Sequence, residues 1–176
     1  MKPTFSDRLK ALPPAIWESD TVKIRPIAND DDLWYATVEC RLTPEQEAED
    51  LVNPAGFSIG RAYLNPADNL PCLIYDKNSK PIGYIVLRTW FDQLHPGFSW
   101  SYYIDKDSQG KGYGKAAARL AIQILKAADP GIPIKLATES YNLKAQKLYE
   151  SVGFVKSEEM DGDDFVFLYQ SSNCDK

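Results

Sequence analysis

The 176-residue sequence has few of the residues that mark metal-binding and disulfide-bonded proteins. Its three cysteines, Cys40, Cys72 and Cys174, are far apart and form no C-x-x-C pair, so neither a disulfide framework nor a zinc site is expected. The single histidine, His95, precedes a Pro-Gly pair in an expected loop and has no histidine or cysteine nearby in the sequence to share a metal ion. The cysteine usage favours a reducing cytoplasm.

Long apolar runs and an excess of positive charge are also missing. No apolar run approaches the roughly 20 residues that a membrane-spanning helix needs, and Asp7, Arg8 and Lys10 interrupt the N-terminal apolar residues, which argues against a secretory signal. The net charge of -5 disfavours nucleic acid, because phosphate binding needs clustered lysine and arginine. We therefore expect a soluble cytoplasmic protein without membrane or nucleic-acid partners, whose acidic surface attracts cationic small molecules.

The composition that is present fits one globular domain. Hydrophobic residues make up 44% of the chain, enough to bury roughly two-thirds of the unfolded surface around a single core. Because no internal repeat, low-complexity tract or linker interrupts the pattern, we expect an N-terminal extension over residues 1–21, one folded domain over 22–170 and a C-terminal tail over 171–176.

Strand and helix signals follow one another along this domain. Strands are expected over residues 22–27, 72–75, 81–87, 98–104, 132–138, 154–157 and 165–169. Helices are expected over residues 31–40, 57–64, 113–129 and 142–150, and a further short helix is expected to begin at residue 44. This order predicts an α/β fold with a mixed, largely antiparallel twisted sheet flanked by helices. The strand-helix-strand unit from Phe98 to Thr138 is expected to be a right-handed crossover, with a ligand near the carboxyl end of its first strand.

The most informative segment runs from Gln109 to Lys115 and reads QGKGYGK. Gly110, Gly112 and Gly114 alternate just before a helix, so backbone amides can point into one concavity at the helix N-terminus and form an anion site. The segment does not fit two commoner phosphate-binding motifs. The P-loop needs a Ser or Thr after its Gly-Lys, and the dinucleotide fingerprint needs a glycine where Lys115 stands. Helix capping alone would not require three alternating glycines followed by a lysine.

This segment resembles the pyrophosphate-binding signature of the GNAT superfamily of CoA-dependent N-acetyltransferases, through Gln109, Gly112 and Gly114. A second segment resembles the later helix of the same superfamily, through Asn142, Ala145, Tyr149, Gly153 and Phe154. Without the resemblance, Tyr149 would be taken as a core aromatic on an amphipathic helix. The resemblance covers about residues 22–169 and implies a single-domain GNAT-like fold.

The resemblance implies acetyl-CoA as the cosubstrate and no metal. Backbone groups near Tyr103 and Ile104 would pair with the pantetheine arm like an added strand, while Asn142 and Tyr149 would face the cofactor. The pyrophosphate would be held by amides of the loop, with charge-assisted contacts from its two lysines; the loop comprises Gln109, Gly110, Lys111, Gly112, Tyr113, Gly114 and Lys115.

The implied reaction is direct attack of a neutral amine on the thioester, with Tyr149 protonating the leaving thiolate and a strand amide stabilising the oxyanion. Many relatives place a carboxylate base on the strand before the glycine loop, whereas this sequence has Ser99, Trp100 and Ser101 there. Glu139 could serve as the base through a water, although a glutamate at a strand end is more often only solvated. The base is otherwise unassigned.

Within the superfamily the chain most resembles bacterial spermine/spermidine and diamine acetyltransferases, over residues 43–46, 58–63, 81–84 and the terminal Asp-Gly-Asp hairpin. Acidic residues would border the acceptor cleft and aromatic residues would flank a cation; they are Glu45, Glu47, Glu49 and Asp50, and Trp90, Phe91, Trp100 and Tyr102. An acidic helix face is also compatible with simple solvation. We expect a small-molecule primary amine as acceptor, with spermidine or spermine as the narrower hypothesis.

Other functions remain open from the sequence. Acetylation of a protein N-terminus, a lysine or an antibiotic amine would use the same cofactor site, and a CoA-binding sensor without efficient turnover is compatible with the missing strand carboxylate. A homodimer formed along a strand edge fits the fold, but no residue pattern specifies its interface.

Overall fold

The computed structural model describes residues 2–49, 53–90 and 95–170, and within them each predicted strand and helix is present with shifted boundaries. The strands are β1 (Val22–Pro26), β2 (Asn69–Asp76), β3 (Pro81–Thr89), β4 (Phe98–Ile104), β5 (Lys135–Thr138), β6 (Phe154–Asp161) and β7 (Asp164–Tyr169). The α-helices are α1 (Phe5–Lys10), α2 (Asp30–Trp34), α3 (Pro44–Ala48), α4 (Ala55–Leu64), α5 (Tyr113–Ala128) and α6 (Leu143–Glu150). Two 3-10 helices, η1 (Pro14–Trp17) and η3 (Lys106–Ser108), and the π-helix η2 (Tyr35–Glu39) complete the order.

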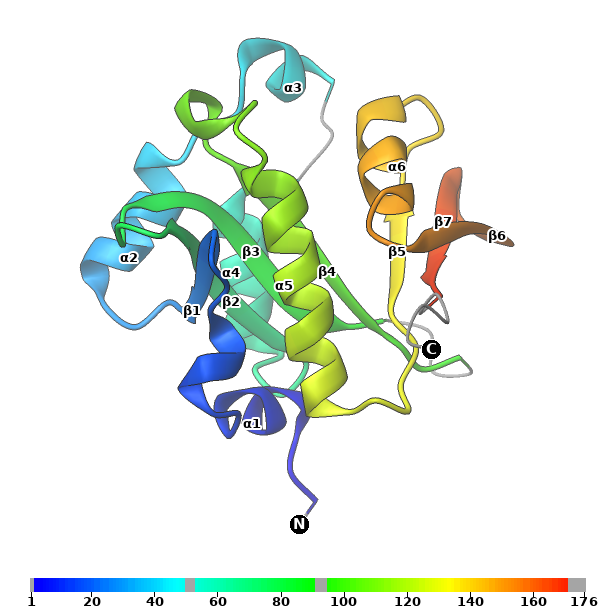
Figure 1. The fold of residues 1–176 in the computed structure, drawn as a ribbon, viewed down its shortest axis with the longest axis horizontal. Helices are drawn as coiled ribbons and strands as arrows, with labels where there is room; N and C mark the ends of the chain where they lie inside the picture. The colour runs from blue at the N-terminus through cyan, green and yellow to red at the C-terminus, as the bar shows by residue number, and fades with distance from the viewer. Residues whose placement is uncertain (1, 50–52, 91–94, 171–176) are drawn as a thin grey trace.

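The strands form two sheets, which corrects the expectation of one sheet. An antiparallel sheet of order β1-β2-β3-β4 stands beside an antiparallel sheet of order β5-β7-β6. In the described chain, the parallel strands β4 and β5 share one bridge, between Phe98 and Ile134. The bridge lies at the amino ends of both strands, so they diverge towards their carboxyl ends and leave a wedge between the sheets (Figure 1).

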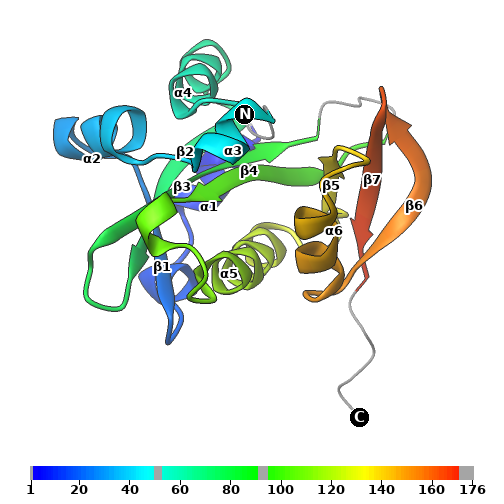
Figure 2. The same ribbon diagram turned by 90° about the horizontal axis from the view of Figure 1, so that it is seen from above.

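Helices cover both faces of the larger sheet. Figure 2 shows α5 on one face and α2, α3 and α4 on the other. Helix α5 is amphipathic, and its apolar side is buried against the sheet because Ala117, Leu120, Ala121, Ile124 and Leu125 recur at helical spacing. This packing fixes the N-terminal end of α5 near the carboxyl end of β4, where the ligand was expected.

The segment before β1 also belongs to this core. Thr4 and Asp7 form a reciprocal capping box that starts α1, and Phe5 and Leu9 are buried in the same cluster as α5. Arg8 pairs with Asp129 at 2.9 Å at the far end of α5. Packing therefore does not separate this segment from the domain that follows it.

The described residues bear on the cysteines, on membrane-spanning helices and on metal-binding groups. Cys40 and Cys72 are buried free thiols there, whereas Cys174 lies outside the described ranges. No helix in those ranges is both long and apolar enough to cross a membrane. A search of the same residues finds no group of three or more His, Cys, Asp or Glu side chains arranged to hold a metal ion.

Candidate active site

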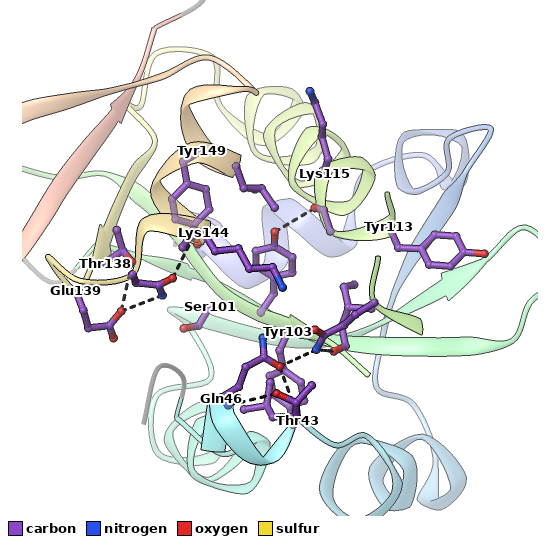
Figure 3. Close-up of a pocket in the computed structure, with 18 of the residues that line it drawn as sticks. Thr43, Gln46, Ser101, Tyr103, Tyr113, Lys115, Thr138, Glu139, Lys144 and Tyr149 are labelled. Carbon is purple, nitrogen blue, oxygen red and sulfur yellow. Dashed lines mark hydrogen bonds between the residues drawn. The ribbon is translucent and has the colours of Figure 1, made fainter. Parts of the chain in front are cut away.

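A cavity of about 620 Å³ occupies the wedge where β4 and β5 diverge (Figure 3). Its walls are β4, the loop after η3, the end of β5, the start of α6 and one side of α3. With one exception, Lys111, the predicted cofactor residues all line it: Tyr103, Ile104, Gln109, Gly110, Gly112, Tyr113, Gly114, Lys115, Asn142 and Tyr149. Glu139, the predicted base, lines it as well. Residues from both sequence motifs thus meet in one cavity.

The glycine loop has the backbone conformation that an amide cradle requires. Gly110 and Gly112 have φ of 75° and 83°, in the left-handed region that side chains other than glycine rarely adopt. Gly112 is the N-cap of α5, and within the described residues no side chain caps this end of the helix. The first-turn N–H groups therefore remain at the cavity wall with the positive end of the helix dipole. Gly114 lies inside the helix, so only two of the three glycines are needed for the turn.

Two lysines line the cavity near this loop, and one of them was not predicted. Lys115 lies in the first turn of α5 and Lys144 in the first turn of α6, on opposite sides of the cleft. Lys111 donates from Nζ to the carbonyl oxygen of Asp107 at 3.0 Å and does not line the cavity. The sequence places Lys144 two residues after Asn142, within the second motif.

The backbone of β4 presents alternate residues to the cleft. The amide of Phe98 donates to a carbonyl just before β5 at 2.8 Å, and the amide of Asp105 donates to a carbonyl of β3 at 2.9 Å. Along a strand, the backbone N–H and C=O groups of successive residues point to opposite sides. The even-numbered residues from 98 to 104 therefore turn these groups towards the cleft, and the odd-numbered residues turn them towards β3. Of the two residues predicted to pair with a pantetheine arm, Ile104 has its backbone towards the cleft, whereas Tyr103 contributes its side chain.

The aromatic side chains of β4 form the core side of the cavity. Trp100 is buried and packs edge-on against Phe154, with ring centroids 5.6 Å apart. Tyr102 donates from its hydroxyl to the carbonyl oxygen of Gly114 at 3.1 Å, which ties β4 to the start of α5. The expected cation-flanking set is therefore only partly assembled: Trp100 and Tyr102 line the cavity, Trp90 lines none of the described cavities, and Phe91 lies outside the described residues.

Tyr149 and Glu139 lie close together in the cavity. Burial raises the pKa of the Tyr149 hydroxyl well above its ordinary value, and the negative charge of Glu139 adds to the shift. Glu139 accepts hydrogen bonds at Oε2 from Asn142 Nδ2 at 3.2 Å and from Thr138 Oγ1 at 3.3 Å. These contacts hold a carboxylate beside a phenol that stays protonated at neutral pH, so the pair can supply a proton donor and a proton acceptor.

Acidic side chains are grouped around Glu139 and on α3. The pKa of Asp164 is raised by partial burial and by three neighbouring carboxylates, those of Glu139, Asp161 and Asp163. Glu49 lines the cavity from the end of α3. Of the other predicted acidic residues, Glu45 is exposed, Glu47 lines a smaller cavity and Asp50 lies outside the described residues.

A partly buried cation lies near these acids. Arg88 on β3 lines the cavity with Ser101, and neither residue was predicted as part of the site. Burial lowers the pKa of the Arg88 guanidinium to about 10, nearby Arg61 lowers it further, and Asp161 opposes the shift. Both signs of charge therefore occur around this part of the cavity, with the acids on the hairpin and on α3 and the arginine on the sheet.

Comparison with known proteins agrees with this geometry. Residues 31–154 match the acetyltransferase (GNAT) family. The chain belongs to that family. A GNAT relative, the L-amino acid N-acyltransferase MnaT of Escherichia coli, is 35% identical over 94 residues, which cover 51% of this chain and 53% of MnaT. The chain spans less than two thirds of the length of the curated relatives that it matches.

Solved GNAT structures share the fold over most of the chain. The aminoglycoside acetyltransferase AAC(6')-Ib in complex with acetyl-CoA superposes with a TM-score of 0.71 at 18% identity, over 89% of this chain and 100% of that one. The spermidine N-acetyltransferase of Vibrio cholerae in complex with CoA and spermine gives 0.62 at 16% identity, over 85% and 94%. At these identities the likeness establishes the GNAT fold, with its mixed arrangement of antiparallel sheets and helices.

Proposed function

We propose that this GNAT protein transfers an acetyl group from acetyl-CoA to a primary amine, with a polyamine such as spermidine or spermine as acceptor. The observation that carries the proposal is the arrangement along one cavity. A glycine loop with left-handed turns, the protonated Tyr149 and the carboxylates of Glu49 and Glu139 all line this cavity.

The residues present fit the chemical parts of CoA. The amides of residues 110–115 and the ammonium groups of Lys115 and Lys144 suit phosphate oxygens. Cleft-facing backbone groups of Tyr102 and Ile104 suit the amide groups of a pantetheine arm, although the Ile104 carbonyl also accepts Gln109 Nε2 at 3.0 Å. When bound, acetyl-CoA supplies the thioester that a neutral amine attacks.

The side chains then divide the proton transfers between them. Tyr149 holds its proton at Oη and donates it to the leaving thiolate. Glu139, fixed by Asn142 and Thr138, accepts the amine proton through a water. A cleft-facing amide of β4, at Trp100 or Tyr102, would stabilise the oxyanion. This assignment provides a base although β4 carries no carboxylate.

The acceptor is expected to be cationic because acids outnumber arginine in the part of the cavity near Glu139 and α3. Glu49, Glu139 and the hairpin aspartates would hold a second ammonium group, while Arg88 would repel one placed against β3. A linear polyamine satisfies both conditions if it lies along the α3 and hairpin side. The fold of the Vibrio cholerae spermidine acetyltransferase supports the same class of acceptor.

The function is tested by following free CoA thiol with acetyl-CoA and a panel of spermidine, spermine, putrescine, lysine peptides and aminoglycosides. Turnover with polyamines alone is expected. Turnover restricted to peptides or aminoglycosides would support the acetyltransferase activity but contradict a polyamine acceptor. Acetyl-CoA binding without turnover on any amine would leave a CoA-binding sensor.

Glu49→Gln is expected to raise KM for spermidine about fivefold, because a cation near one surface carboxylate gains about 1 kcal/mol. KM for acetyl-CoA should stay unchanged. Glu45→Gln on the same helix is the matched control, since Glu45 is exposed and lines none of the described cavities. Equal effects of the two substitutions would show that only the general charge of α3 matters.

The pH dependence of kcat/KM should rise towards high pH as the acceptor amine loses its proton. Because burial and Glu139 raise the pKa of Tyr149 above 10.0, its proton is retained and no falling limb should occur below about pH 10. Initial rates measured up to about pH 10 test whether the pKa of Tyr149 is raised. A falling limb near pH 8 that is missing in Tyr149→Phe would contradict it.

A further inference from the structure

Helix α3 spans the cavity mouth without being anchored in the core. It has five residues, and none of them is buried. An isolated helix of this length is unstable in water, so hydrogen bonds must determine its position. The positions that line the main cavity, Thr43, Gln46 and Glu49, lie at its two ends and middle, on the acceptor side of the site.

Gln46 joins this helix directly to the glycine loop. Gln109 Nε2 donates to Gln46 Oε1 at 2.8 Å across 63 positions of sequence and also donates to the carbonyl oxygen of Ile104 at 3.0 Å. Gln46 Oε1 accepts a second hydrogen bond from the amide of Thr43 at 3.2 Å, as part of the capping box of α3. Figure 3 shows Gln46 and Thr43 together beside Tyr103 at this wall.

The orientations of the two amide groups are fixed by their partners. Gln109 must present its NH₂ group, because its partner atom on Ile104 is a carbonyl oxygen. Gln46 must present its oxygen, because it accepts from the backbone N–H of Thr43. The contact between the two side chains is therefore a donor-acceptor pair that one isosteric substitution can break and another can keep.

Further contacts hold both ends of α3. Before the helix, the amide of Arg41 donates to Asp105 Oδ2 at 3.0 Å. After it, the hydroxyl of Tyr141, in the turn between β5 and α6, makes a long contact of 3.5 Å with the carbonyl oxygen of Glu49. The helix thus connects the glycine loop to the far wall of the cleft.

We propose that Gln46 is a positioning residue that makes the placement of α3 at the acceptor side depend on the occupancy of the glycine loop. The proposal rests on the assignment of that loop to CoA under the proposed function. A ligand held by the amides of residues 110–115 fixes Gln109, which orders α3 through Gln46. By linkage, an ordered α3 strengthens cofactor binding by the same factor.

The test measures backbone hydrogen exchange of residues 41–49 at short labelling times, with and without saturating CoA. In the unmodified protein, CoA should slow exchange in this segment about tenfold, within the usual range of coupling between sites. Gln109→Glu replaces the NH₂ donor with a carboxylate and should reduce the slowing to less than about twofold. Gln46→Glu adds the same charge but keeps an acceptor for both donors, so the slowing should persist.

Separate readouts distinguish the cofactor assignment from the proposed connection. Calorimetric titration of each variant with CoA establishes saturation, and failure of the unmodified protein to bind CoA would remove the assignment and the proposal together. Full protection in CoA-saturated Gln109→Glu would show that CoA contacts α3 directly and would overturn the role of Gln46. Loss of protection in Gln46→Glu would also overturn it, because that variant retains the acceptor.

Discussion

Tyr149→Phe is expected to lower kcat by about 10²–10³-fold, which corresponds to the loss of a positioned general acid. The ring should keep its place, because Tyr149 packs against Phe154 and Phe167 with centroid distances of 5.8 and 6.4 Å. The KM for acetyl-CoA should therefore change by less than about threefold, and the thermal midpoint should not fall. Steady-state kinetics with the best amine of the panel measures both parameters.

Tyr169→Phe is the matched control for this substitution. Tyr169 packs against the same Phe154 at 5.4 Å and does not line the cavity. Its kcat should equal that of the unmodified protein. If Tyr149→Phe retained more than a third of the original kcat, another group would have to protonate the thiolate, and the assignment of Tyr149 would be abandoned.

Gly112→Val is expected to weaken CoA binding by at least about tenfold. A β-branched residue at φ 83° is strained by about 1–2 kcal/mol, and relief of that strain would turn the first amides of α5 away from their common direction. The free energy of unfolding should fall by a similar amount, because Gly112 is the N-cap of α5. Calorimetric titration with CoA and chemical denaturation measure the two effects separately.

Gly60→Ala provides the opposite case within the same chain. Gly60 lies inside α4, and an added methyl group there would meet no heavy atom within 4 Å. We expect unchanged CoA affinity and a gain of about 0.5–1 kcal/mol in stability, from the higher helix propensity of alanine. Normal CoA affinity in Gly112→Val would mean that the loop amides are not the phosphate site.

The local structures near the cavity that the sequence predicts correctly are those determined by local chemistry. A capping residue, an N1 proline and early acids over residues 43–46 predict the start of α3, and the structure has a capping box there. The alternating glycines before α5 predict a turn, and two of them have the positive φ that only glycine readily adopts. Such signals need only neighbouring residues and no knowledge of the tertiary fold.

Other features depend on contacts that a single sequence does not reveal. Strand patterns locate β4 and β5 but do not show that these strands separate beyond Phe98. The bond between Gln46 of α3 and Gln109 of the glycine loop joins two segments whose proximity follows from the packing of α5. Lys111 was expected to face an anion because of its place in the motif, yet the turn of η3 directs its ammonium group to Asp107.

The two faces of β4 follow from strand periodicity. Phe98, Trp100 and Ile104 share one parity of β4 and all are buried in the main core cluster. Ser99 and Ser101 have the other parity. This alternation places Trp100 on the core side of β4, where it also lines the cavity, and Ser101 on the side of α4.

The single bridge between Phe98 and Ile134 has a further consequence for thermal stability. Beyond this bridge, the facing edges of β4 and β5 form no further β-bridges with each other in the described structure. A bound molecule with amide groups could therefore hydrogen-bond to both edges and connect the two sheets. A ligand present at a hundred times its Kd would then raise the free energy of unfolding by about 2.7 kcal/mol. The melting temperature of the protein should accordingly report how much of it carries its cosubstrate.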